Sequence, residues 1–254
     1  HGCVGGDWSR GGAEDYRRML RYYAANGVTS VCAATMSLPE PPLREAMARL
    51  GAFIGAERDS LSGAAMCGIN MEGPFFSGEK CGAQDPENLR EPSATFFEEM
   101  QAAAGGHILL CDFAPELPGA DAFLAAERGK VVLSLAHTAA DYETARRAIE
   151  AGAGHVTHLY NAMTPFTHRA PGVVGAAFDS PVTAELIADG VHVDPAAVRV
   201  TFRMLGGRAV LISDSMEACG MPDGVYELGG QEVFVRGGRA LLRDGTIAGG
   251  CTNL

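Results

Sequence analysis

Residues 130–161, KVVLSLAHTAADYETARRAIEAGAGHVTHLYN, contain the alternation that decides the fold. An apolar run ends in His137, and a helical segment follows, with Asp141 or Thr138 as its predicted N-cap and Gly152 as its stop. A second β-rich run then ends in His158. Strand, helix and strand in this order form a right-handed crossover between parallel strands. The stretch therefore predicts part of a parallel sheet whose strands end in histidines.

The same alternation extends over most of the 254 residues. An open doubly wound sheet would need a glycine-rich phosphate loop after its first strand, and the chain has none there. We therefore predict a (β/α)8 barrel of the TIM type, with residues 1–254 as one domain. An eighth strand, the first in order, is expected just before His1, and a β-hairpin insertion at about residues 225–247. The seven predicted strands are 27–35, 65–72, 107–113, 130–137, 154–158, 182–189 and 209–214.

Composition and charge exclude several classes of protein. No run of about 18 apolar residues is present, so no membrane span is predicted. The net charge of −11 argues against a nucleic-acid partner, although a local cluster could still bind a small anion. The seven cysteines include no C-x-x-C pair and fall mostly in apolar runs. We therefore expect reduced core thiols in a cytoplasmic protein.

Four polar residues lie at the carboxyl ends of four different predicted strands: Glu72, His137, His158 and Asp214. Taken singly, each has an ordinary structural explanation: a hydrogen-bonded histidine, an ion-pair partner or a helix cap. In a barrel, however, all these strand ends meet at one face, where active sites are built. Buried carboxylates and imidazoles need compensation, so the group together predicts a bound divalent cation.

Two imidazoles and one carboxylate also leave a metal position open for water, which is typical of a catalytic site. Zn²⁺ is the first expectation for the ion, and Fe²⁺, Co²⁺ and Mn²⁺ suit the same ligands. Asp214 would then be the group that transfers protons. His1, directly after the expected first strand, is a further candidate ligand.

Several motifs together resemble the N-acetylglucosamine-6-phosphate deacetylases of the amidohydrolase superfamily. The resemblance extends over nearly the whole chain. It rests on NMEGPFFSGEKCGAQDPENLR (70–90), LSLAHTAADYETA (133–145), THLYNAMTPFTHRAPGVVGA (157–176), ELIADGVHVDP (185–195), LISDSMEACGMPDG (211–224) and DGTIAGG (244–250).

The resemblance implies a role for each matching position. It makes Glu72, His137 and His158 the metal ligands and Asp214 the catalytic aspartate. Many amidohydrolases have an H-x-H pair at the first strand that binds a second ion. His1 stands where the second histidine of this pair would be, so the sequence does not decide whether a second metal binds. Position 84 is Gln, where some relatives have His. The implied substrate contacts are Ala83, Gln84, Asn161, Ala162, Arg169, His192 and Ile247, Ala248, Gly249, with Arg169 and His192 at the phosphate and the sugar.

The resemblance also implies a reaction and an assembly. A metal-dependent barrel of this kind would hydrolyse the acetamide of N-acetyl-D-glucosamine 6-phosphate to glucosamine 6-phosphate and acetate. Relatives form homodimers and carry a small β-sandwich domain from both chain ends, so we expect both ends of this chain to be truncated. His155 and His168 have no implied role; we expect His155 to be structural and His168 to lie near the phosphate.

Three other interpretations remain open from the sequence. The chain could deacetylate N-acetylgalactosamine 6-phosphate or another amide, because the residue that distinguishes the sugar epimers cannot be placed. It could be a catalytically silent module that binds sugar phosphates, which would tolerate loss of the metal ligands. A purely structural barrel would bind no metal.

Overall fold

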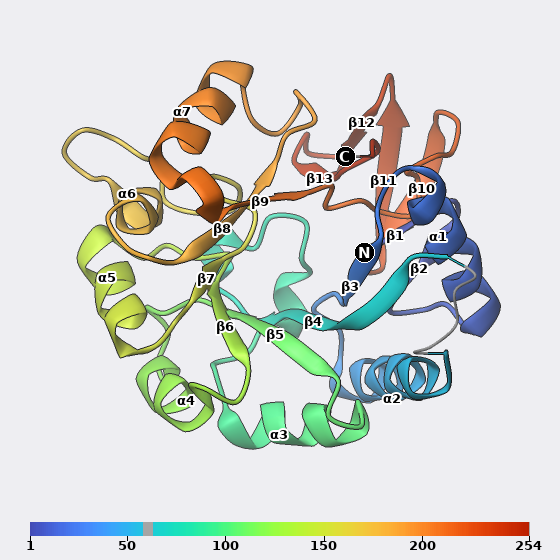
Figure 1. Ribbon diagram of the computed structural model, residues 1–254, viewed down its shortest axis with the longest axis horizontal. Helices are drawn as coiled ribbons and strands as arrows, with labels where there is room; N and C mark the ends of the chain where they lie inside the picture. Colours follow the sequence, from blue (N-terminus) through green and yellow to red (C-terminus); the bar gives the residue numbers. More distant parts are fainter. Residues whose placement is uncertain (58–62, 254) are drawn as a thin grey trace.

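A computed structural model describes residues 1–57 and 63–253, so residues 58–62 and 254 of the predicted domain lie outside its described part. Seven strands form one parallel sheet in the order β3-β4-β5-β6-β7-β8-β9, in which every neighbour is also the next strand along the chain. The sheet curls into a barrel wall, which confirms the predicted fold class (Figure 1). The strands are Ser30–Ala34, Ala65–Phe75, Ile108–Phe113, Val132–Leu135, His155–Val156, Thr183–Ile187 and Ala209–Ile212.

A helix connects each strand of the barrel to the next, and these helices surround the sheet from outside (Figure 1). In α5, the Asp141 side chain accepts the Thr144 N–H at 2.8 Å, and Gly152 ends the helix at a φ of 128°. Asp141 is therefore the cap, while the alternative, Thr138, instead donates its hydroxyl to Glu116. The helices are α1 Ala13–Ala25, α2 Glu40–Glu57, α3 Ala94–Ala103, α4 Ala120–Glu127, α5 Tyr142–Ala151, α6 Gly172–Phe178 and α7 Pro195–Leu205.

Six of the seven strands end elsewhere than the sequence predicted, and β4 and β7 show the physical reasons. β4 continues beyond Glu72 to Phe75, but its register against β5 shifts between Met71 and Phe75. Glu72 thus lies at an irregularity of the ladder, the kind of position where a strand re-aims a side chain. β7 stops at Val156, because His158 has a φ of 34° that no strand can accommodate.

Aromatic packing holds the outer helices against the middle of the sheet. The ring of Phe123 in α4 contacts Phe75 and Phe113 of the sheet and Phe97 of α3, with centroids 5.1, 5.7 and 5.9 Å apart. Each of these four rings is at most 2% exposed. Buried aromatic rings in edge-to-face contact stabilise beyond the area that they bury, so this cluster anchors the strand that carries Glu72.

The predicted hairpin region forms a four-stranded antiparallel sheet beside the barrel mouth, in the order β10-β11-β12-β13 (Figure 1). Gly229 and Gly230 link β10 to β11, and Gly237 and Gly238 link β11 to β12; all four have positive φ, as type I′ turns require. A separate two-stranded ribbon, β1-β2, follows His1. These strands are β1 Gly2–Cys3, β2 Gly6–Asp7, β10 Gly224–Leu228, β11 Gln231–Arg236, β12 Arg239–Leu241 and β13 Ile247–Gly249.

Two expectations from composition have different outcomes. None of the helices in the described residues has the length and apolar character to cross a bilayer. All seven cysteines are free thiols, but they are not all in the core: Cys32 and Cys67 are exposed. Both thiols line a second cavity together with Leu110 and Glu185, so the apolar residues around them in the sequence did not predict their exposure.

Candidate active site

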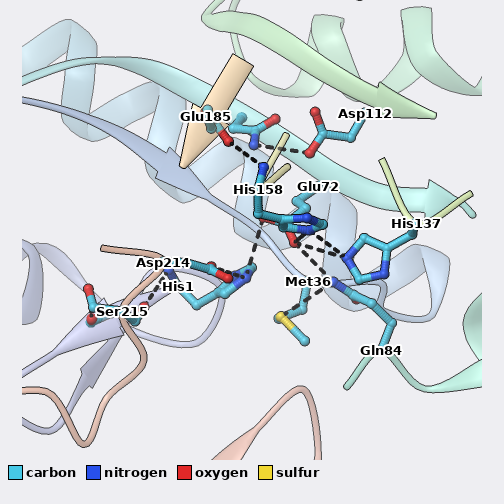
Figure 2. Close-up of polar contacts among 12 residues, drawn as sticks. His1, Met36, Glu72, Gln84, Asp112, His137, His158, Glu185, Asp214 and Ser215 are labelled. Carbon is cyan, nitrogen blue, oxygen red and sulfur yellow. Dashed lines mark hydrogen bonds and ion pairs between the residues drawn. The ribbon is translucent and has the colours of Figure 1, made fainter. Parts of the chain in front are cut away.

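Glu72, His137 and His158 meet at the mouth of the barrel with their polar atoms facing one another (Figure 2). Glu72 Oε1 lies 3.5 Å from His137 Nε2 and 3.9 Å from His158 Nε2, and the two Nε2 atoms are 3.0 Å apart. Ligand atoms around one tetrahedral zinc lie roughly 3.3–3.5 Å from one another, given bonds of about 2.0–2.1 Å. The three side chains therefore fit a single divalent ion.

The ring of His137 is oriented for ligation by its own surroundings. Its Nδ1 lies 3.0 Å from the carbonyl oxygen of Lys80, which can only accept, so Nδ1 carries the hydrogen and Nε2 has a free lone pair. Phe76 stacks on the ring at a centroid distance of 4.3 Å. Gly82 leaves room on another side, because a Cβ there would lie 3.3 Å from His137 Cε1.

Gln84 also orients a ligand. The backbone N–H of Ser37 donates to Gln84 Oε1 at 2.8 Å, which turns the amide nitrogen toward Glu72 Oε1 at 3.4 Å. Figure 2 shows the amide nitrogen of Gln84 facing both Glu72 and the sulfur of Met36. The sequence assigned Gln84 a substrate contact, and the structure adds a hydrogen bond to a predicted metal ligand.

A second group shares Glu72 on its other side. His1 Nε2 lies 3.4 Å from Glu72 Oε2 and 3.4 Å from Asp214 Oδ1, so that His1, Glu72 and Asp214 form another set of possible ligands (Figure 2). Asp214 therefore lies close to the first group, because the ring of His1 contacts both Asp214 and Glu72. This is the place that a proton-transferring carboxylate would need.

The buried charges of the site stabilise one another. Burial opposes ionisation of Glu72, but the rings of His1, His137 and His158 outweigh it and hold the pKa of Glu72 well below its usual value. Burial likewise lowers the pKa of His1, yet the carboxylates of Glu72 and Asp214 raise it to about 10. Burial and the neighbouring His137 lower the pKa of His158, which favours the neutral ring that a metal requires.

Backbone strain is concentrated at these strand exits. His137, His158 and Asp214 have φ values of 44°, 34° and 46°, and Ala162 has 49°. Non-glycine residues in this left-handed region cost about 1–3 kcal/mol each and collect at functional sites. The surrounding fold therefore keeps these residues in a backbone conformation that is unfavourable by itself.

A cavity of about 350 Å³ opens onto the cluster. Every predicted site residue lines it except Arg169, which lies in an exposed loop, and in the described part of the chain the Arg169 side chain has no hydrogen bond or ion pair. His155 and His168 are also outside it; His155 bonds Thr183 and lies 3.3 Å from Glu185 below the site. Two of the lining residues that the sequence missed, Gly82 and Thr246, are direct neighbours of the predicted residues Ala83 and Ile247. The six missed residues are Met36, Glu79, Lys80, Gly82, Leu228 and Thr246.

Fold and site together define the class of this protein. A (β/α) barrel with two histidines, a glutamate and an aspartate at its strand exits is a barrel of the amidohydrolase type. No protein-family model matches the chain. Known proteins do: the N-acetylglucosamine-6-phosphate deacetylase of Bacillus subtilis (strain 168) is 42% identical over 253 residues, which cover 98% of this chain and 64% of that protein.

Other relatives agree. The N-acetylgalactosamine-6-phosphate deacetylase of Escherichia coli O157:H7 is 36% identical, over 98% of this chain and 66% of its own length. A mutant of the N-acetyl-D-glucosamine-6-phosphate deacetylase of Mycobacterium smegmatis, solved in complex with N-acetyl-D-glucosamine-6-phosphate, superimposes with a TM-score of 0.93 at 36% identity, over 99% of this chain and 65% of its own. The N-acetylglucosamine-6-phosphate deacetylase of Thermotoga maritima superimposes with a TM-score of 0.89 at 30% identity, over 99% of this chain and 67% of its own. The chain belongs to the N-acetylglucosamine-6-phosphate deacetylase family.

Proposed function

We propose that the protein hydrolyses the acetamide of N-acetyl-D-glucosamine 6-phosphate, with a divalent metal ion bound by Glu72, His137 and His158. The observation that supports this most is the convergence of these three side chains, with Asp214 beside them, in one cavity. The chain spans 64% of the length of the Bacillus subtilis relative, so the reaction is proposed for the protein to which this barrel belongs.

The residues of the chain have separate tasks in this reaction. A bound divalent cation supplies Lewis-acid activation of the carbonyl and of water. Asp214 takes one proton from the attacking water and passes it to the departing nitrogen, so that the C–N bond breaks to acetate and the amine. Asn161, the Ala162 backbone and His192 bind the sugar, and residues 247–249 close the cavity over it.

Zn²⁺ is the proposed ion, with Fe²⁺, Co²⁺ and Mn²⁺ as the other ions that nitrogen and oxygen ligands accept. One ion per subunit is expected at the first group, and His1 would contribute only to a second. Metal analysis of the purified protein and acetate release from the phosphorylated sugar test the proposal together. Protein that binds no metal and releases no acetate when Zn²⁺ or Fe²⁺ is supplied would contradict it.

Deacetylation of N-acetylgalactosamine 6-phosphate is the second candidate, because the Escherichia coli relative at 36% identity bears that name. The two sugars differ in the configuration of one hydroxyl. A site built to hydrogen-bond one hydroxyl can discriminate by as much as about 10⁴-fold. Side-by-side values of kcat/KM on the two sugars decide between the candidates.

Assembly and compartment are also proposed. The family resemblance suggests a homodimer, and the exposed Phe166, Val200 and Met204 near α6 and α7 offer apolar surface for it. Light scattering of the purified protein measures this. Seven free thiols suit a reducing compartment such as the cytoplasm.

A further inference from the structure

The tight turn after β8 is built around one carboxylate. Asp189 Oδ1 accepts the backbone N–H of Val191 at 2.8 Å and that of His192 at 2.9 Å. Its other oxygen, Oδ2, lies 2.7 Å from His192 Nδ1. Both side chains are only 5% exposed. The same group thus shapes the turn and contacts the ring of a residue that lines the cavity.

The ionisation of Asp189 determines which ring nitrogen holds a hydrogen. Burial opposes ionisation, but the hydrogen bonds from the His192 and Val191 backbone and from the His192 ring hold the pKa of Asp189 below its usual value. Ionised at neutral pH, the carboxylate can only accept, so His192 Nδ1 must be the donor. Nε2 forms no hydrogen bond with any described residue, while the ring lines the same cavity as Asn161 and Asp214.

We propose that Asp189 is a positioning residue of the substrate site: it holds His192 with the Nδ1 hydrogen on the carboxylate and Nε2 available to an oxygen of the bound sugar phosphate. The orientation of the ring stands on the geometry alone, and its use in turnover rests on the proposed function. In many histidines, the hydrogen bond made by one ring nitrogen determines the protonation state and the direction of the other nitrogen.

Replacing only Oδ2 of Asp189 by an NH₂ group distinguishes its contact with the His192 ring from its part in forming the turn. In Asp189→Asn, the carbonyl oxygen can still accept both backbone N–H groups, but the amide NH₂ replaces Oδ2 and donates to His192 Nδ1. The hydrogen of the neutral ring must then move to Nε2. Asp194→Asn is the matched control, because Asp194 caps α7 by accepting the Ala196 N–H and lies only two residues beyond His192.

Nitrogen NMR of the histidine rings in the full chain tests the orientation without any need for turnover. His192→Gln identifies the signals, and spectra are recorded at a pH where the ring is neutral. We expect the Nδ1–H form in the native protein and in Asp194→Asn, and the Nε2–H form in Asp189→Asn. An Nε2–H ring in the native protein, or the same form with and without Asp189, overturns the proposal.

Kinetics test the consequence for substrate. Asp189→Asn should lower kcat/KM by about 10- to 100-fold, the usual cost of losing such a partner, with an unchanged melting temperature. In a His192→Gln background the same exchange should cost almost nothing, because Asp189 acts through that ring. Independent, additive losses contradict the proposal. A native protein inactive on every sugar phosphate contradicts the proposed function, while the NMR result still decides the role of Asp189.

Discussion

Glu72 is the residue that the two groups at the barrel mouth share. Its Oε1 faces His137 and His158, and its Oε2 faces His1. The ladder irregularity between Met71 and Phe75 places this side chain, so its position depends on β5 as well as on its own strand. Residues His137 and His158 depend in the same way on left-handed backbone that only the surrounding fold maintains.

Glu72→Gln should weaken metal binding, since an amide is neutral and offers one ligand oxygen in place of a charged carboxylate. We expect a loss in affinity larger than the roughly 10- to 100-fold that a supporting residue costs. Metal content after dialysis against a competing chelator measures it. Glu79→Gln, which changes a cavity-lining carboxylate outside both ligand groups, should keep the native content. Equal metal content in the two variants would remove Glu72 from the ligand set.

Asp214→Asn should retain metal and substrate binding but lose proton transfer. The expected fall in kcat is about 10²- to 10⁴-fold, with KM near the native value. Acetate release at saturating substrate gives kcat, and the metal content shows that the site is intact. Asp121→Asn, in the first turn of α4, is the control and should turn over normally. Near-native kcat in Asp214→Asn would assign the proton transfer to another group.

At the scale of elements, the helices support the strand exits that they follow. α5 begins five residues after His137, and its cap Asp141 accepts the Thr144 N–H. The short β7 has only two residues, so the exit at His158 is held by neighbouring strands and turns more than by its own ladder. Helix caps beside the site therefore contribute to its geometry.

Asp141→Ala should lower the free energy of unfolding by about 1 kcal/mol, because the Thr144 N–H loses its acceptor. Asp141→Asn should stay close to the native value, since asparagine caps helices as well as aspartate does. Urea unfolding followed by circular dichroism measures both. A loss of equal size in the two variants would show that the charge, and not the cap, stabilises α5.

At the scale of the whole molecule, the packing of the barrel buries several carboxylates. Besides Glu72, Asp112 is fully buried, and the Glu185 side chain is 13% exposed. Asp112 is hydrogen-bonded to Thr157 and Asn70. Burial, together with the charges of Glu72 and Glu185, raises the pKa of Asp112 well above its usual value. An acid whose pKa is raised by folding destabilises the fold increasingly as pH rises above its unfolded value of about 3.8.

Asp112→Asn should therefore stabilise the protein near neutral pH, and the gain should shrink to nothing below about pH 4, where aspartate is neutral in both states. Asn70 Oδ1 has no partner in the described structure. If the Asn70 amide flips, this oxygen can accept the hydrogen of the new amide at position 112. Unfolding free energies of both proteins across this pH range provide the measurement. A gain independent of pH would point to packing as its source.

Much of the architecture could be predicted because it is local. Residues 130–161 contain the apolar run, the cap and the glycine stop that define a strand, a helix and the next strand, and the barrel follows from their repetition. The ends of β4 and β7 could not be predicted, because a ladder irregularity and a left-handed φ depend on neighbouring strands. The four strands over residues 224–249 similarly exceeded the expected single hairpin.

The sequence by itself determined the order of strands and helices and the residue types at the strand exits, because periodicity and caps act between residues close along the chain. Only the tertiary structure decided the rest. It brought residue 80 to the ring of His137 and Gln84 to Glu72, and it left Arg169 off the cavity wall. The reason is that such contacts join side chains from different segments of the barrel, whose distances and ring orientations depend on how the whole barrel packs.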